Sequence, residues 1–170
     1  MGFGGLGYTP GGGGGFSGGN GGGIGGGGTP AAVSNIYDAG FTFLIESATQ
    51  LEFEVMEVML VTSAYSFSRT SANVAAVSNE ISQGVRRRVA VEEVISNGNN
   101  VEIYLADVTF VDLAAGDTPG GVVVYFVQGA TDADNIPLFY MELNTTGAPA
   151  SNNVAVDWAD PAVILPLLQG

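Results

Sequence analysis

After residue 30, short blocks of hydrophobic and polar residues alternate along most of the chain, and turn-forming residues separate them. The block at 55–61 carries apolar residues on nearly both of its faces, which predicts a strand covered on two sides. From residue 85 onward, six further strand-like blocks follow one another, separated by stretches rich in glycine, proline, asparagine or aspartate. These blocks span 85–95, 101–111, 122–129, 138–144, 154–159 and 162–168.

Two other segments carry a weaker periodicity. The apolar residues of 41–48 suit either one short helix or part of a strand, and the pattern leaves both open. Residues 71–84 predict one short helix or turn, with Ser71 as the cap and Gly84 as the stop. The apolar residues at helical spacing in this second segment are Val74, Val77 and Ile81.

Many short strands with little helix predict an all-β domain at residues 31–170. We expect an antiparallel β-sandwich or barrel of about seven to eight short strands with one short helix. Trp158 and Tyr125, together with other aromatic residues at strand spacing, are expected to pack in the core or at interfaces. The other aromatic residues in this group are Phe126, Phe139 and Tyr140.

Residues 1–30 have a different composition, because 18 of the 27 glycines of the chain lie there and no charged residue does. One interpretation is a disordered tail. The alternative, which we favour, is an extended arm that becomes ordered on a neighbouring subunit, since 30 extended residues reach about 100 Å. Five apolar residues, here called the arm studs, would fill pockets of that partner. They are Phe3, Leu6, Tyr8, Phe16 and Ile24.

Charge narrows the classes of partner. The chain has 17 acidic residues, four arginines, no lysine and no histidine, which gives a net charge of −13 and a pI near 4.1. Such a surface repels phosphate groups and anionic lipids, so we expect neither nucleic-acid nor membrane binding. The N-terminus does not resemble a secretory signal and no apolar run is long enough to span a bilayer, which predicts a soluble acidic protein.

The residue inventory argues against catalysis, because histidine, cysteine and lysine are all absent. Glu52 with Glu54, or Asp132 with Asp134, could form a carboxylate pair for glycoside hydrolysis, but we expect a strand face and a turn instead. Asp132, Asp134 and Asn135 could also ligate Ca²⁺, with an ordinary turn as the alternative. We predict no enzymatic activity and no cofactor.

Arg86, Arg87 and Arg88 form the one concentration of positive charge. Three successive residues of a strand point to alternate faces, so they cannot all meet one partner. Pairing with glutamates of the same domain, namely Glu80, Glu92 or Glu93, is one interpretation. The other is a clamp on carboxylates of a neighbouring subunit, because arginine forms bidentate pairs.

From Met59 to Leu168, the order of segments resembles a family of small virion structural proteins of tailed bacteriophages. The segments "LVTSAY", "ADVTF", "GVVVYFVQGATDADNIPLFYMEL" and "VAVDWA" carry the resemblance, whereas "GVRRRVAV" replaces a glycine-rich stretch and the arm has no counterpart. The matching positions are Leu60, Val61, Thr62, Ser63, Tyr65, Asp107, Val108, Thr109, Phe110, Tyr125, Pro137, Leu138 and Trp158.

The resemblance implies a structural component of a virion. We expect a decoration or cement protein on the capsid exterior that binds the major capsid protein and itself, as an oligomer such as a trimer. The arm studs and Arg86–Arg88 would make the partner contacts. A tail or neck component and a glycan- or receptor-binding adhesin are the two alternatives.

Overall fold

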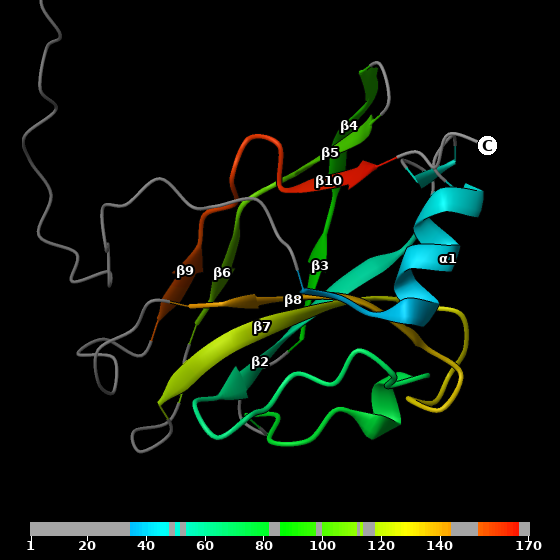
Figure 1. Cartoon of the computed structure of the whole chain (residues 1–170). Coiled ribbons are helices and arrows are strands. Elements are labelled where there is room, and N and C mark those ends of the chain that lie inside the picture. The colour runs from blue at the N-terminus through cyan, green and yellow to red at the C-terminus, as the bar shows by residue number, and fades with distance from the viewer. Residues whose placement is uncertain are drawn as a thin grey trace, which may run out of the picture.

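Antiparallel strands dominate the computed structural model, which describes residues 35–47, 50–51, 54–81, 86–97, 100–111, 113, 118–143 and 153–166 (Figure 1). The helices of this part are α1 (Asp38–Ser47) and the 3-10 helix η2 (Val74–Ala76). The strands are β1 (Asn35–Ile36), β2 (Met56–Thr62), β3 (Arg87–Val89), β4 (Val91–Asn97), β5 (Asn100–Leu105), β6 (Val108–Phe110), β7 (Pro119–Phe126), β8 (Ile136–Glu142), β9 (Val154–Val156) and β10 (Val163–Pro166).

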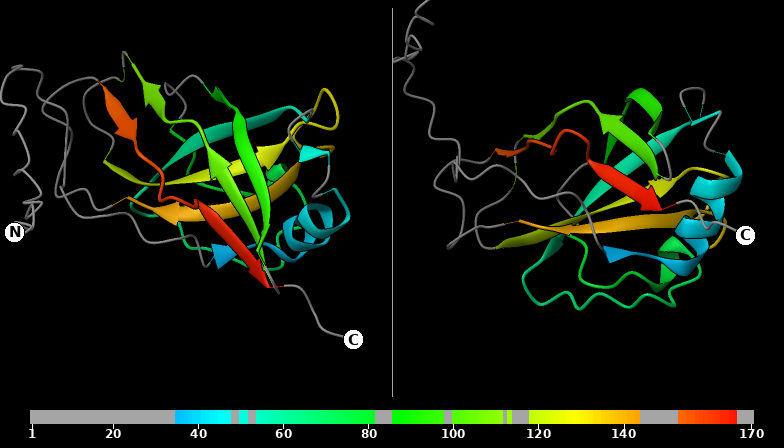
Figure 2. Two further views of the ribbon diagram at one scale, coloured as in Figure 1. Left: turned by 90° about the horizontal axis from the view of Figure 1, so that it is seen from above. Right: turned by 45° about the horizontal axis from the view of Figure 1, so that its top comes forward.

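The strands form three sheets. The largest has the order β1-β8-β7-β2-β3, a second has the order β10-β5-β4, and β6 pairs with β9 in the third. Every pairing is antiparallel. The predicted all-β class with one short α-helix is therefore confirmed, and the two smaller sheets lie on the same side of the five-stranded sheet (Figure 2).

Strand β2 is buried on both faces, as the block at 55–61 predicts. Met56, Val58 and Leu60 join a core cluster to which all three sheets contribute. Met59 and Val61 point the other way, into a second cluster that the segment 63–81 covers (Figure 1). The apolar residues alternate on both faces because a second layer lies on each side of the strand.

Two predicted strands are wrong as single elements. The block 85–95 divides at Ala90 into β3 and β4, and the block 101–111 divides at Ala106 and Asp107 into β5 and β6. The two halves of each block belong to different sheets. The amide of Ala106 donates a hydrogen bond of 3.0 Å to the carbonyl of Ala90, which joins the two breaks. The apolar residues face one shared core on both sides of each break. At the second break the buried positions shift from odd (101, 103, 105) to even (108, 110) numbers, so the extra residue keeps β6 facing the core.

The helical alternative for 41–48 is confirmed, although α1 begins earlier, at Asp38. The helix packs on β8 (Figure 1), and Gly40 makes the close contact. A β-carbon at position 40 would lie 2.4 Å from the Cα atom of Leu138, so only glycine allows this approach without a shift of the strand.

The short helix or turn predicted for 71–84 is the 3-10 helix η2, over the described residues 71–81. Its N-cap residue is Asn73, not Ser71. The amide of Ile81 bonds to the carbonyl of Leu60, and Glu80 forms a β-bridge with Val61, because pairing with β2 satisfies this backbone in place of a further helical turn. Gly84 lies outside the described residues.

The remaining predicted strands are confirmed with shifted ends, as β7, β8, β9 and β10. The aromatic prediction also holds, because Tyr125, Phe139, Tyr140 and Trp158 are buried. Phe126 is partly buried and stacks on Phe43 of α1, with ring centres 4.3 Å apart. Residues 1–34, including the predicted arm and all five arm studs, lie outside the described residues.

Candidate functional site

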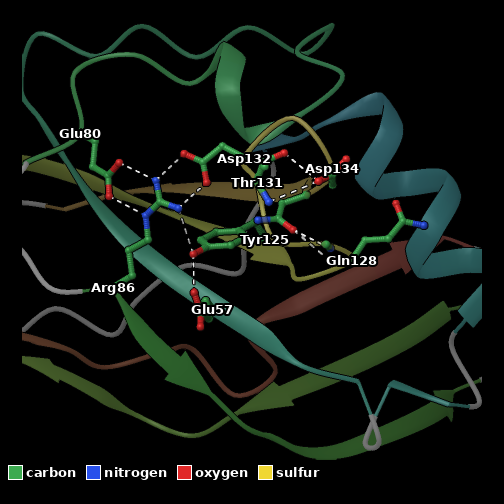
Figure 3. A network of polar contacts seen from close by, with 10 residues as sticks. Glu57, Glu80, Arg86, Tyr125, Gln128, Thr131, Asp132 and Asp134 are labelled. Carbon is green, nitrogen blue, oxygen red and sulfur yellow. Dashed lines mark hydrogen bonds and ion pairs between the residues drawn. The ribbon is translucent and has the colours of Figure 1, made fainter.

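Arg86 is the centre of a polar network at the start of β3 (Figure 3). Its guanidinium donates two bonds of 2.7 Å to the carboxylate of Glu80. It donates two more, of 2.6 and 2.9 Å, to the carboxylate of Asp132. The planar guanidinium thus holds two carboxylates in bidentate geometry, the arrangement in which arginine binds this group most strongly.

Tyr125 extends the network across the sheet. The phenol oxygen receives a bond of 3.4 Å from Arg86 and donates one of 2.5 Å to Glu57 on β2. The guanidinium carbon also lies 5.4 Å from the centre of the Tyr125 ring, within the range of a cation–π contact. We call these five residues, Glu57, Glu80, Arg86, Tyr125 and Asp132, the arginine clasp.

The clasp joins segments that are far apart in the sequence. Glu80 lies near the end of the segment 63–81, which covers one face of the five-stranded sheet, and Asp132 lies in the β7–β8 loop. Two backbone carbonyls of that loop also accept hydrogen bonds from the covering segment. The carbonyl of Asn135 accepts from the amide of Val74, and the carbonyl of Asp132 accepts from the amide of Ala75. Backbone and side-chain bonds therefore fasten the covering segment to the loop at two points.

The charges of the clasp stabilise one another. The hydrogen bonds that Arg86 donates to Glu80 and then to Asp132 raise the pKa of Arg86 above its usual range, and its bonds to Asp132 hold the pKa of that carboxyl below its ordinary value. Burial, followed by the hydrogen bond to Glu57, raises the pKa of the Tyr125 phenol. At neutral pH the phenol is therefore protonated and donates a hydrogen bond to the carboxylate of Glu57, which makes it a structural group and a poor nucleophile.

Pairing within the domain is confirmed for Arg86, with Glu80 as predicted and Asp132 in addition. All five N–H donors of its guanidinium have an acceptor in the clasp, so no donor is left for a neighbouring subunit. The sequence does not reveal Asp132 and Tyr125 as partners of Arg86, because they are 46 and 39 residues away. No local pattern connects positions so far apart.

Arg87 and Arg88 point to opposite faces of β3, as strand geometry predicts. Arg87 lies opposite Val58 on the core side, and its buried Nε has no hydrogen-bond partner among the described residues. Arg88 is exposed and lies opposite Glu57. It also borders an open groove of about 230 Å³, whose other lining residues are Glu54, Val55, Met56, Val89 and Ala90. The partner role of these two arginines stays a prediction.

The aspartates of the β7–β8 loop are directed to separate partners. Asp132 binds Arg86, Asp134 accepts from the hydroxyl of Thr131 at 2.7 Å, and Asn135 accepts from the amides of Gln128 and Gly129 (Figure 3). In the described part of the chain, no group of three or more acidic residues is placed to hold a metal ion. This geometry matches the turn alternative for the loop.

Two residues of the proposed family pattern meet away from the clasp. The carboxylate of Asp107 accepts from the amide of Trp158 at 3.2 Å, and the indole of Trp158 donates to the carbonyl of Ala106 at 2.9 Å. Both bonds hold the segment after β9 against the start of β6. The segments "ADVTF" and "VAVDWA" thus form one structural unit although 51 residues separate the bonded pair.

Comparison with known proteins gave no matching family model, no matching curated protein and no matching solved structure.

Glu52, one member of the carboxylate pair considered for hydrolysis, lies outside the described residues. Over the residues that the structure describes, no helix has the length and apolar character needed to cross a membrane.

Proposed function

We propose that the protein is a structural component of a tailed-phage virion, most specifically a decoration protein bound to the outside of the capsid. The contact between Asp107 and Trp158 carries this proposal. It joins two segments of the family pattern, and most apolar positions of that pattern are buried in the described domain. These buried positions are Leu60, Val61, Val108, Phe110, Tyr125, Leu138 and Trp158.

Within this proposal, the five-stranded and three-stranded sheets form a β-sandwich that β6 and β9 complete at one end. The shared core cluster of the three sheets supports it. Strand β1 lies at the edge of its sheet, so the chain preceding Asn35 starts from that edge. Residues 1–30 would extend from there as the arm and contact the major capsid protein or a neighbouring copy in an oligomer such as a trimer.

Charge supports a position on the capsid exterior. A net charge of −13 keeps particles apart and disfavours contact with nucleic acid or anionic lipid. Two of the four arginines are already paired within the domain, Arg69 with Asp38 and Arg86 in the clasp. The phenol and carboxylates of the clasp are likewise committed to structure, which favours a binding role over catalysis.

Co-sedimentation with phage heads tests the proposal. Full-length protein would be mixed with heads of the phage that encodes it, purified from a mutant lacking this chain. A variant with all five arm studs replaced by serine keeps the length and charge of the chain, and a variant lacking residues 1–30 removes the arm. We expect saturable binding by the intact protein and strongly weakened binding by both variants.

Each other result has a defined consequence. Equal binding by all three proteins would place the contact in the domain and remove the arm from the proposal. Failure of the intact protein to bind heads would overturn the decoration role. Binding to isolated tails or to a glycan in that case would favour the tail component or the adhesin, respectively.

A further inference from the structure

The three-stranded sheet packs its inner face on the core, and no element of the described residues covers its outer face. Val101, Ile103 and Leu105 of β5 are buried, whereas the residues between them face outward. In the view from above, no described element crosses over β4, β5 and β10 (Figure 2, left). The five-stranded sheet differs in this respect, because both of its faces are covered.

Glu102 lies at the middle of this open face between two isoleucines. Its cross-strand neighbours are Ile95 on β4 and Ile164 on β10, and Ile164 is 39% exposed. Residues directly opposite each other in antiparallel strands bring their side chains together on one face. The row therefore presents a carboxylate flanked by aliphatic side chains.

Two hydrogen bonds orient the carboxylate of Glu102. The side-chain amide of Asn97 donates to one oxygen at 2.8 Å, and the phenol of Tyr104 donates to the other at 3.2 Å. Tyr104 in turn lies opposite Glu93 on β4. We call this surface the outer β5 face and define it by six residues: Glu93, Ile95, Asn97, Glu102, Tyr104 and Ile164.

The charge of this face has no counterion in the described chain. Desolvation, followed by the charge of Glu102, the hydrogen bond to Glu102 and the charges of Glu93 and Asp160, raises the pKa of Tyr104. Among the described residues, the ion pairs join Arg69 to Asp38, and Arg86 to Glu80 and Asp132. The two other arginines are on β3, in a different sheet.

We propose that the outer β5 face is a docking surface for a partner-protein segment that carries arginine or lysine beside aliphatic side chains. The cation pairs with the oriented carboxylate of Glu102 and lies over the ring of Tyr104, where the quadrupole of the ring attracts it. Ile95 and Ile164 contact the aliphatic side chains on either side. The described chain supplies the anion, the ring and the apolar flanks, and the partner supplies the cation.

Charge also distinguishes this partner from others. A second copy would bring a face of the same sign, and nucleic acid or anionic lipid would bring negative phosphates. The outer β5 face is distinct from the predicted arm contacts, and the inference goes beyond the proposed decoration role. It holds for any particle or partner with the stated chemistry.

A peptide titration tests the surface without using phage particles. The ¹⁵N-labelled full-length chain would be titrated with acetyl-Ile-Arg-Val-Arg-Ile-amide, and in parallel with the same peptide carrying neutral citrulline for arginine. We expect saturable amide shifts concentrated in β4, β5 and β10. Loss of a charge-assisted bond is worth about tenfold in affinity, so we expect binding of the citrulline peptide to be weaker by about that factor.

Matched variants locate the site. Glu102→Gln keeps the size of the side chain and should weaken the arginine peptide about tenfold. Glu142→Gln removes the same charge from an exposed position on β8 and should leave the affinity within about twofold. Glu93→Gln provides a second test on the face, with a smaller loss expected because Glu93 makes neither of the bonds that orient Glu102.

Three results would overturn the proposal. One is the lack of saturable shifts with the arginine peptide. Another is an equal loss of affinity in Glu102→Gln and Glu142→Gln, which would indicate diffuse attraction to an acidic protein. The third is equal affinity for the arginine and citrulline peptides. Because the assay contains no heads, its failure is distinguishable from failure of the decoration role.

Discussion

Arg86 and Asp132 are 46 residues apart in the sequence and are joined by two charge-assisted hydrogen bonds of 2.6 and 2.9 Å. The pair fastens the edge strand β3 to the β7–β8 loop, and Glu80 brings the covering segment to the same guanidinium. One side chain thus holds three parts of the fold that the backbone does not place together. This network also explains the role of Arg86, one of the three successive arginines at 86–88, which the sequence alone does not decide.

Replacement of Arg86 by glutamine should lower the free energy of unfolding by about 2 kcal/mol, because it leaves two partly buried carboxylates without a cation. Denaturant unfolding at pH 7 measures the change. Arg88→Gln is the matched control, since this side chain is exposed, and should cost less than about 0.5 kcal/mol. Equal effects of the two variants would contradict a structural role for the clasp.

The clasp predicts a loss of stability in acid. Arg86 depresses the pKa of Asp132 in the folded state below its ordinary value of 3.8, so this contribution is complete above that value. It disappears as the pH falls through the lower folded-state pKa. Unfolding followed from pH 6 to about pH 2 should show this decline. Asp132→Asn should be less stable at pH 6 and converge with the parent protein at the acid end.

Tyrosine ionisation predicts behaviour in alkali. Burial is the first cause of a raised pKa at Tyr37, Tyr125 and Tyr140, so their protonated forms favour the folded state. Stability from these phenols is complete below their ordinary value of 10.0 and falls as the pH rises toward the folded-state values. In a spectrophotometric titration, Tyr37 and Tyr125 should ionise only as the protein unfolds, and Tyr140 should ionise at a higher pH than a free tyrosine. Their ionisation near pH 10 with the fold intact would contradict the prediction.

Gly40→Ala should destabilise the protein by about 2 kcal/mol, although alanine is the better helix former. The added carbon would lie 2.4 Å from the Cα atom of Leu138, so α1 must move away from β8. Thermal unfolding would measure the effect. Thr42→Ala, at an exposed position of the same helix, is the control and should change stability by less than about 0.5 kcal/mol. A stabilised Gly40→Ala variant would show that the contact relaxes freely.

The sequence predicts those features of the fold that depend on neighbouring residues. Strand β2 carries apolar residues on both faces because both faces are buried. This pattern can be recognised in the sequence without knowing which elements cover the strand. For residues 41–48 the sequence allows a short helix or part of a strand, because the few apolar positions suit both, and the structure has the helix α1 at 38–47. Its contact with Leu138 decides between them, and that contact is tertiary.

Most of the features that were missed depend on residues distant in the sequence. The break at Ala90 keeps the apolar alternation, because Val89 and Val91 face one core on either side of it. At Ala106 the buried positions shift from odd to even numbers between Leu105 and Val108, which is a sign of that break within the sequence itself. Asp132 was considered as a Ca²⁺ ligand or a turn residue, and its bond to Arg86 could not be inferred from spacing. The outer β5 face could be recognised in part, since Glu102 and Tyr104 alternate with buried residues. Its isoleucines come from two other strands, whose register only the structure provides.

The two breaks at Ala90 and Ala106 determine how a mechanical load would spread through the molecule. A pull on the three-stranded sheet divides between three covalent routes, one through Ala90 into the five-stranded sheet and two into the pair of β6 and β9, through Ala106 and through residues 157–162. The bond between Ala106 and Ala90 ties two of these routes together where they part. Detaching the loaded sheet by force would then require rupture of strand pairing in two other sheets, so the tension is shared before either yields.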